Sequence, residues 1–327
     1  MKKTFLAIVL ATSLTLAGCA SAPDSKPNFD RYVAQFNTAQ PNTSVSITRK
    51  DGFKLRVREF GASLRGQKPT LVLMHGFPDN QHLYDLLIPN LAKQHHVVSF
   101  DFLGWGASDK PPQHLYNVAS QRSDLDAVID ELKLNSVVLV LHDLSGQPGI
   151  DWALDNEAKT SALVLLNTYY SDMPTLKAPD AIQFYSTPGV FRNIAIWGAN
   201  KIGARFESGL ASQIEKFFSN PEARQTFVPI LAHDSASIRP AFFSSTSVLW
   251  DEVNARAKET ARIQQFKKPT HVIFGADDPF LNKGVAQSFK ELFPRSSLDI
   301  VEKAGHYVQL DRGDEVARII LARLQEK

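Results

Sequence analysis

Six short, largely apolar runs recur along the chain, and they constrain its fold more than any other feature of the sequence. They occupy residues 70–74, 96–100, 136–141, 162–166, 270–274 and 297–301. Each run has the length of a β-strand and shows little alternation between apolar and polar positions. This pattern is typical of strands that are covered on both faces, as in a parallel sheet. The chain is therefore expected to bury a sheet between layers of helices.

Helical periodicity separates these runs. Apolar side chains recur three and four positions apart in residues 121–134, and a similar stripe occurs in residues 316–324. Before the first run, residues 43–60 form two alternating stretches around Asp51-Gly52, which is a common signal of a β-hairpin. A hairpin followed by alternating strands and helices predicts an α/β fold, with a mostly parallel sheet and helices on both of its faces.

Residues 169–255 interrupt this alternation. They contain several prolines, aromatic pairs such as Phe242-Phe243 and no convincing strand, and the alternation resumes at Pro269. We interpret residues 43–168 and 256–327 as one α/β core, and residues 169–255 as a helical cap inserted over its site. The alternative is a helical insertion that only stabilises the fold.

The amino-terminal residues have the pattern of a bacterial export signal. Lys2 and Lys3 precede an apolar stretch over residues 5–16, which is too short to span a membrane. The next residues, from Leu16 to Cys19, resemble a bacterial lipobox, in which the cysteine becomes the lipidated first residue of the mature chain. The alternative is an ordinary secretory signal that happens to contain a cysteine.

The lipobox interpretation places the protein in the bacterial cell envelope. It predicts a signal peptide over residues 1–18, a lipid anchor on Cys19 and a polar tether over residues 19–42. By resemblance to other lipoproteins, Ala20 after the cysteine favours anchoring to the outer membrane, facing the periplasm.

Composition excludes several classes of function. Cys19 is the only cysteine, so neither an intramolecular disulfide nor a cysteine-based metal site can form. The formal net charge of +2 disappears when Lys2 and Lys3 are removed with the signal peptide, so nothing favours a nucleic-acid partner. The sequence contains no phosphate-binding loop, metal-ligand cluster or cofactor fingerprint. We therefore expect a function that needs no metal or cofactor; the oligomeric state is not readable.

Acid–base side chains follow three of the predicted strands. Asp143 comes after the run that ends at residue 141, Asp277 and Asp278 come after residues 270–274, and His306 comes after residues 297–301. Because the carboxyl ends of parallel strands meet at one edge of a sheet, these side chains can converge although they are distant in sequence.

These residues belong to motifs that carry a family resemblance. The motifs are His75–Asp79, Asp101–Pro111, His142–Gly146, Gly275–Pro279 and Gly305–Gln309. In this order, from about residue 45 to the end, they resemble the α/β-hydrolase fold, in the branch of epoxide hydrolases and haloalkane dehalogenases. The order of nucleophile, acid and histidine is that of the α/β-hydrolases.

Two residues compete for the role of nucleophile. The nucleophile of this fold lies on a strained turn and has small residues two positions before and two after it. Asp143 has Leu141 and Ser145 at these positions, whereas Ser145 has Asp143 and Gln147. Asp143 therefore has one small flank and Ser145 has none. We favour Asp143, and Ser145 remains the alternative.

The resemblance implies a role for each residue of the site. Asp143 would attack a saturated carbon and form an alkyl ester, and His306 would then activate the water that hydrolyses this ester. Asp278 would orient His306, and the family pattern Gly-x-x-Asp-Pro selects it over Asp277. The backbone N–H groups of Phe77 and Leu144 would stabilise the oxyanion.

Hydrolysis of an epoxide to a diol is the leading prediction. In this family, two cap tyrosines usually protonate the oxygen that leaves as the ring opens. Candidates here are Tyr169, Tyr170 and Tyr185, with His233 as a further donor, and residues 186–255 contain no tyrosine. The aromatic content of the cap predicts a small apolar organic substrate.

Three alternatives remain. Haloalkane dehalogenases usually bind the halide through indole N–H groups, one of them on the residue after the nucleophile, which here is Leu144. Trp197 and Trp250 lie in the insertion. A carboxylesterase would use Ser145 as its nucleophile. A non-catalytic binding lipoprotein could keep the fold without activity, although such a module has no need of Asp143, Asp278 and His306 together.

Overall fold

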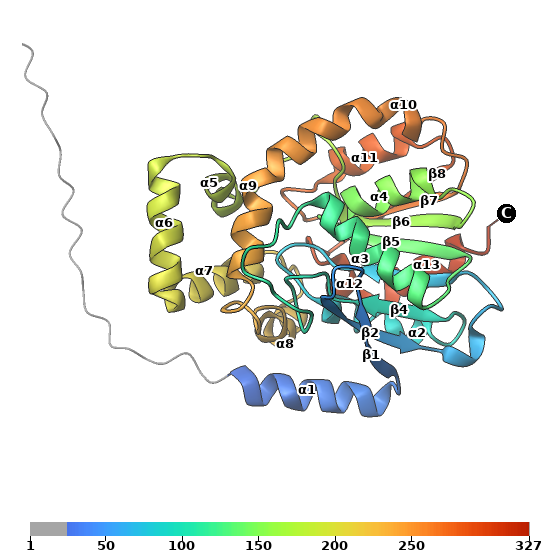
Figure 1. The fold of residues 1–327 in the computed structure, drawn as a ribbon. Helices are drawn as coiled ribbons and strands as arrows, with labels where there is room; N and C mark the ends of the chain where they lie inside the picture. Colours follow the sequence, from blue (N-terminus) through green and yellow to red (C-terminus); the bar gives the residue numbers. More distant parts are fainter. Residues whose placement is uncertain (1–24, 327) are drawn as a thin grey trace, which may run out of the picture.

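The computed structural model describes residues 25–326 and contains one eight-stranded sheet, in the order β1-β2-β4-β3-β5-β6-β7-β8 (Figure 1). The strands are β1 (Thr43–Thr48), β2 (Lys54–Phe60), β3 (Thr70–Met74), β4 (Val97–Phe100), β5 (Val137–Asp143), β6 (Thr160–Thr168), β7 (Thr270–Gly275) and β8 (Ser296–Val301). β2 is antiparallel to β1 and β4, and all other neighbouring strands are parallel. The six apolar runs correspond to β3 to β8, so the predicted α/β class is confirmed.

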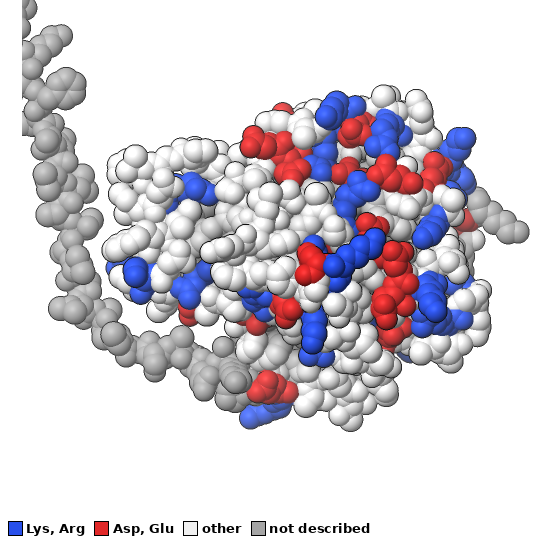
Figure 2. All heavy atoms as spheres, in the orientation of Figure 1, with Lys and Arg blue, Asp and Glu red and all other residues white. Residues whose placement is uncertain are grey.

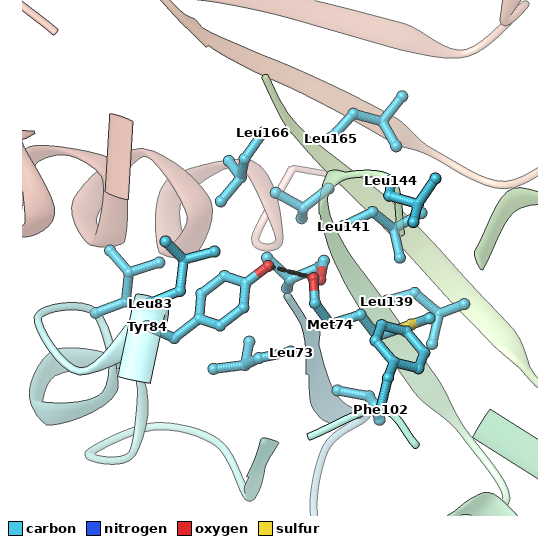
Figure 3. Close-up of a cluster of buried hydrophobic side chains, with 14 of the residues drawn as sticks. Leu73, Met74, Leu83, Tyr84, Phe102, Leu139, Leu141, Leu144, Leu165 and Leu166 are labelled. Atoms are coloured by element: carbon cyan, nitrogen blue, oxygen red, sulfur yellow. Dashed lines mark hydrogen bonds between the residues drawn. The ribbon is translucent and has the colours of Figure 1, made fainter. Parts of the chain in front are cut away.

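The middle of the sheet is the hydrophobic core. Every residue of β3 is buried, and every residue of β5 before Asp143 is buried. Leucine side chains of β3, β5 and β6 lie against one another, and the hydroxyl of Tyr84 donates a hydrogen bond of 2.7 Å to the carbonyl of Met74 (Figure 3). This bond satisfies the only polar group of a large buried side chain. The core lies directly beneath the point where β5 ends.

Two layers of helices cover the sheet. They are α2 (Ile88–Leu91), α3 (Val118–Glu131), α4 (Gly146–Asp155), α11 (Lys283–Leu292), α12 (Val308–Asp311) and α13 (Gly313–Arg323), with short 3-10 turns η1 (Ala62–Leu64) and η2 (Gln81–Tyr84). The chain moves from β3 to β4 in one direction across the sheet, and from β4 through β5 to β8 in the other. Because parallel crossovers are right-handed, α2 lies on one face and α3, α4 and α11 on the other. α13 contacts α2.

The segment between β6 and β7 is helical. Its elements are α5 (Asp180–Ser186), α6 (Val190–Lys201), α7 (Gly203–Glu215), α8 (Pro221–Leu231), α9 (Arg239–Arg256), the 3-10 turn η3 (Ala257–Glu259) and α10 (Thr260–Ile263). α5, α6, α7 and α8 lie beyond one end of the core, and α9 leads back toward α10 (Figure 1). The boundary of α8 follows from its sequence, because the side chain of Asn220 accepts the N–H groups of Glu222 and Ala223 and Pro221 needs no partner for its nitrogen.

The amino-terminal part of the described chain is not a tether. Ser25–Ala39 form helix α1, which packs on the protein. Phe29 stacks on His233 with 3.8 Å between ring centroids, the Tyr32 hydroxyl donates a 3.1 Å hydrogen bond to Asp85, and Phe36 packs edge-on against Phe60. The predicted tether over residues 19–42 is therefore wrong for this segment.

The physical reason lies in a periodicity that the polar composition hides. Phe29, Tyr32 and Phe36 follow one another at the spacing of one helix face, so they form an apolar stripe on an otherwise polar segment. The predicted signal peptide and Cys19 lie outside the described residues and stay predictions. Within residues 25–326, no helix combines the length and apolarity needed to cross a bilayer.

The docking of α1 can be tested by substitution. Phe36→Ala should lower the free energy of unfolding by about 1–3 kcal/mol, because it removes a ring that is partly buried against Phe60 and beneath the guanidinium of Arg58. Arg31→Ala, on the exposed side of the same helix, should change it by less than about 0.5 kcal/mol. Chemical denaturation measures both. Equal effects of the two substitutions would mean that α1 is not docked.

Candidate active site

Asp143 lies on a sharp turn between β5 and α4. Its backbone has a φ of +49°, a left-handed conformation that costs a non-glycine residue about 1–3 kcal/mol and that aspartate tolerates better than most residues. The Thr168 hydroxyl donates a 2.6 Å hydrogen bond to the carbonyl oxygen of Asp143. A Cβ on Gly76 would lie 2.5 Å from the Cβ of Asp143, so only glycine fits beside the turn. The turn presents the aspartate side chain at the carboxyl edge of the sheet.

Leu141, which stands where a small residue is usual, is accommodated by the helix. A Cβ on Gly149 of α4 would lie 2.3 Å from a methyl group of Leu141. A Cβ on Gly146 would lie 2.1 Å from the Thr168 hydroxyl. The two glycines of α4 therefore provide the close approach of strand and helix that small flanking residues usually provide.

The strand ends bring the three predicted acid–base residues together. His306 follows β8, and its Nδ1 lies 2.8 Å from the Oδ2 of Asp278, which follows β7. The Nε2 of His306 lies 3.8 Å from the Oδ2 of Asp143. Asp277 is exposed and accepts a hydrogen bond from Ser219, so Asp278 is the carboxylate that orients His306.

Asp278 is itself held in place by several donors. Its Oδ1 accepts the backbone N–H groups of Phe280 and Leu281, and its Oδ2 accepts the side-chain amide of Asn167. Asn167 also accepts the N–H of Gly275 and so links the ends of β6 and β7. The sequence analysis missed Asn167, because an asparagine at a strand end carries no signal of such a role.

Two backbone donors point at Asp143 itself. The N–H of Phe77 donates a 2.9 Å hydrogen bond to Oδ1 of Asp143, and the N–H of Leu144 also donates to this carboxylate. Both predicted oxyanion donors therefore point at the carboxylate of Asp143, whose Oδ1 accepts the N–H of Phe77 and whose Oδ2 faces His306. This arrangement stabilises negative charge that develops on a group attached to Asp143.

Burial and mutual charge set the pKa values of this trio. Burial alone would lower the pKa of His306, but the charge and hydrogen bond of Asp278 and the charge of Asp143 raise it to about 9. Burial opposes ionisation of Asp278, yet the charge of His306 and the donated hydrogen bonds hold its pKa below the usual value. Burial raises the pKa of Asp143 despite the nearby His306. At neutral pH His306 is therefore a charged imidazolium.

Asp79 is a further buried carboxylate beside these three residues, and the sequence analysis did not select it as a site residue. Asp79 accepts a 2.9 Å hydrogen bond from the hydroxyl of Tyr307, and its Oδ2 lies 3.9 Å from Nδ1 of His142. Burial and the charge of Asp143 raise the pKa of Asp79 to about 7. His142 donates toward the carbonyl oxygen of His306 over 3.0 Å and so supports the loop that carries this residue. The sequence signal that could have identified Asp79 is its position as the acidic residue of the motif His75–Asp79.

Ser145 is not placed to act as a nucleophile. It is fully buried, and its hydroxyl oxygen lies 2.8 Å from the carbonyl oxygens of Met74 and His142 and from the N–H of His142. These bonds tie the turn to β3. Ser145 therefore stabilises the turn on which Asp143 lies, and its geometry disfavours the serine-nucleophile alternative.

A cavity of about 300 Å³ opens over Asp143 and His306. Its floor contains these two residues with Phe77 and Leu144, and its walls are mostly apolar side chains of the loop after β6 and of α5, α7 and α9. Such a lining fits a small apolar molecule. Within residues 25–326, no cluster of three or more His, Cys, Asp or Glu side chains is arranged to hold a metal ion.

The four candidate proton donors separate into two pairs. Tyr169 and Tyr185 line the cavity. Tyr170 points away, and its hydroxyl donates a 2.6 Å hydrogen bond to Asp151. His233 stacks on Phe29 of α1 and does not line the cavity. The predictions for Tyr170 and His233 are therefore wrong, because both side chains are used to pack the fold.

Tryptophan contributes little to the cavity wall. Of the four tryptophans, Trp250 alone lines it, and its indole N–H donates a 2.9 Å hydrogen bond to the hydroxyl of Ser186. Trp105 and Trp152 are buried elsewhere, and Trp197 is exposed. The cavity therefore lacks a pair of indole N–H groups directed at a leaving group.

The coupling between His306 and Asp278 predicts a pH dependence. Because the folded-state pKa of His306 lies above its ordinary 6.5, the charged ring stabilises the fold fully below pH 6.5, and this contribution is lost as pH rises through about 9. Asp278→Asn should return the pKa of His306 toward or below 6.5. Asp277→Asn, on the exposed neighbour, should leave it unchanged. Titration of the His306 ring by NMR measures both variants, and equal shifts would contradict the assignment.

Comparison with known proteins places this geometry in a family. Residues 69–313 match the family model of the alpha/beta hydrolase fold. A cis-3-alkyl-4-alkyloxetan-2-one decarboxylase of Xanthomonas campestris is 25% identical over 78% of this chain and 88% of its own. A haloalkane dehalogenase of Mycolicibacterium paratuberculosis is 26% identical over 78% of this chain and 83% of its own.

Solved structures agree on the fold. The crystal structure of a bacterial membrane phospholipase A superimposes with a TM-score of 0.72, at 18% identity, over 92% of this chain and 91% of that one. Likeness at this identity concerns the architecture alone, because one fold supports many reactions. The family model covers most of the core and the whole inserted segment, and the protein therefore belongs to the alpha/beta hydrolase fold family.

Proposed function

We propose that this hydrolase opens small apolar epoxides to diols through a covalent ester on Asp143. The observation that carries the proposal is the environment of the Asp143 carboxylate. The carboxylate accepts the N–H groups of Phe77, on Oδ1, and of Leu144, while Oδ2 faces His306 at the cavity. In a serine hydrolase such donors would have to remain available for the carbonyl oxygen of the substrate. Here they are already directed at the residue that forms the ester.

The first step needs a nucleophile and a proton donor. Oδ2 of Asp143 attacks a ring carbon of the epoxide, the carbon–oxygen bond of the ring breaks, and an alkyl ester forms. The ring oxygen takes up a proton as it leaves. Tyr169 and Tyr185 line the cavity, and burial raises the pKa of both hydroxyls, so both remain protonated donors at neutral pH.

The second step needs a neutral base. His306 is charged in the resting site, in part because Asp143 raises its pKa. Formation of the ester removes the negative charge of Asp143, so the pKa of His306 falls and the ring can return a proton to the tyrosinate that the first step leaves. Neutral His306 then deprotonates a water molecule, which attacks the carboxyl carbon of Asp143. The oxyanion forms where the Phe77 and Leu144 N–H groups already point, and the diol leaves.

Dehalogenation is the second candidate, and one relative at 26% identity is a haloalkane dehalogenase. The same nucleophile and base would serve it. A departing halide, however, needs hydrogen-bond donors rather than a proton. The indole N–H of Trp250 already donates to Ser186. The residue after Asp143 is Leu144, whose side chain has no N–H to donate. The two tyrosines in the wall therefore favour an oxygen leaving group over a halide.

The covalent step can be observed directly. The His306→Gln variant should keep the attack by Asp143 but lose hydrolysis of the ester, so incubation with an apolar epoxide should increase the protein mass by the mass of one epoxide. Digestion should locate the added mass on Asp143. Intact-protein and peptide mass spectrometry measure both.

Two further variants make this experiment decisive. His306→Gln combined with Asp143→Asn should form no adduct, whereas His306→Gln with Ser145→Ala should form it if the fold is kept. A panel of haloalkanes, activated esters and oxetanones is tested in parallel. An adduct formed from a haloalkane but not from any epoxide would change the assigned reaction to dehalogenation, and an acylated serine would overturn the aspartate mechanism.

The tyrosines provide an independent prediction. Tyr185→Phe should lower kcat for an epoxide by about 10²-fold or more, because the leaving oxygen loses a positioned proton donor. Tyr170→Phe should lower it by less than about threefold, since its hydroxyl is bound to Asp151 outside the cavity. Steady-state hydrolysis measures both. A larger loss in Tyr170→Phe than in Tyr185→Phe would contradict the assignment.

A further inference from the structure

Helix α6 carries a cluster of exposed apolar side chains. Val190, Phe191, Ile194 and Trp197 of α6 and Ile202 just after it are between 59% and 81% exposed, and Phe184 of α5 is 42% exposed. Of the eight large apolar side chains that are exposed in the described chain, these six lie within residues 184–202. We call this surface the α6 face. An exposed apolar cluster of this kind marks an interaction surface.

The cluster follows from how α6 packs. Val190, Phe191, Ile194 and Trp197 are spaced so that they point to one side of the helix. The opposite side faces the cap, where Ala199 is buried and Arg192 donates a hydrogen bond to the carbonyl of Tyr185. The helix is therefore fixed to the rest of the cap by its inner side, and its apolar outer side is mostly exposed.

The charged residues within the segment that forms this face are all basic, and Asp180 and Glu207 stand at its two ends. Residues 181–206 contain Arg192, Lys201 and Arg205 and no acidic residue. The end of the molecule formed by α5 to α7 is largely white in Figure 2, with blue Lys and Arg groups and little red. Apolar and aromatic side chains flanked by cations are the combination that binds the interface of an anionic bilayer.

The amino-terminal end of α1 lies against the cap. Phe29 of α1 contacts His233 of the cap, whereas Phe36, two turns later, contacts Phe60 of β2. The amino-terminal end of α1 is therefore directed toward the cap. In the sequence, Cys19, the predicted lipid site, precedes Ser25 by six positions.

We propose that the α6 face lies in the interface of an anionic phospholipid bilayer, with the cap directed toward the membrane. A second copy of the chain is the competing occupant. A stable dimer buries about 20–30 residues on each side with matched shapes, and the six apolar side chains of the α6 face are few for that. A bilayer accepts such side chains without shape complementarity.

This orientation has a consequence for substrate access. The helices on either side of α6 contribute Tyr185, Arg205 and Phe206 to the cavity wall. Binding of α6 to a bilayer therefore brings the apolar cavity next to the hydrocarbon phase, in which apolar molecules concentrate. The proposal does not depend on which reaction Asp143 performs.

Vesicle binding tests the proposal without using activity. A chain that begins at Ser21 keeps every described residue and hence every contact reported above, and it lacks the predicted lipid site. It should co-sediment with vesicles of phosphatidylethanolamine and phosphatidylglycerol, and less with vesicles of phosphatidylcholine alone. Phe191→Ser with Trp197→Ser should weaken this binding about tenfold or more, because each ring loses its transfer into the apolar phase.

Leu115→Ser is the matched control, because Leu115 is another exposed apolar side chain and lies outside the α6 face. It should bind vesicles as the parent chain does, and thermal unfolding should be the same in all three proteins. Equal vesicle binding of the parent and the double variant would overturn the proposal. So would a dimer in sedimentation equilibrium that the double variant dissociates while the parent fails to bind vesicles.

Discussion

The left-handed backbone of Asp143 is the constraint on which the rest of the site depends. It turns the chain at the end of β5 so that the side chain leaves the core and enters the cavity. The turn exists because its neighbours leave no other arrangement. Gly76 makes room on one side, Thr168 holds the carbonyl, and the buried hydroxyl of Ser145 ties the turn to β3. Ser145, the alternative nucleophile, thus stabilises the turn that carries Asp143, the proposed nucleophile.

Electrostatics in this region is a matter of shared charge. Asp143, Asp278 and Asp79 lie close to a single imidazolium; Asp278, Asp79 and His306 are buried, and Asp143 is largely shielded from solvent. The low polarity of the surroundings makes each charge depend on the others. Asp79, with a pKa raised to about 7, can take up a proton and limit the excess of negative charge. Any reaction that neutralises Asp143 lowers the pKa of His306, which is the electrostatic coupling that the proposed sequence of nucleophile and base requires.

The cap helices present two different surfaces. The inner sides of α5, α7 and α9 close the cavity over Asp143, while the outer side of α6 exposes apolar residues. Helix α1 adds a further link, because it contacts both η2 of the core and α8 of the cap through Tyr32. Helix α1 and the cap therefore pack against each other.

The sequence by itself determined the sheet, the order of its strands along the chain and the carboxylates and histidine at the strand ends. Apolar runs covered on both faces leave few possible folds, and parallel strands bring Asp143, Asp278 and His306 to one edge. What the tertiary structure decided was which polar side chains remain available. Tyr170 and His233 were candidate proton donors besides Tyr185 in the sequence, yet neither lines the cavity, because they contact Asp151 and Phe29 instead. Helix α1 depends on tertiary contacts too: its aromatic side chains pack on the protein through contacts with His233, Asp85 and Phe60. Such contacts join residues far apart in the chain, and no local pattern encodes them.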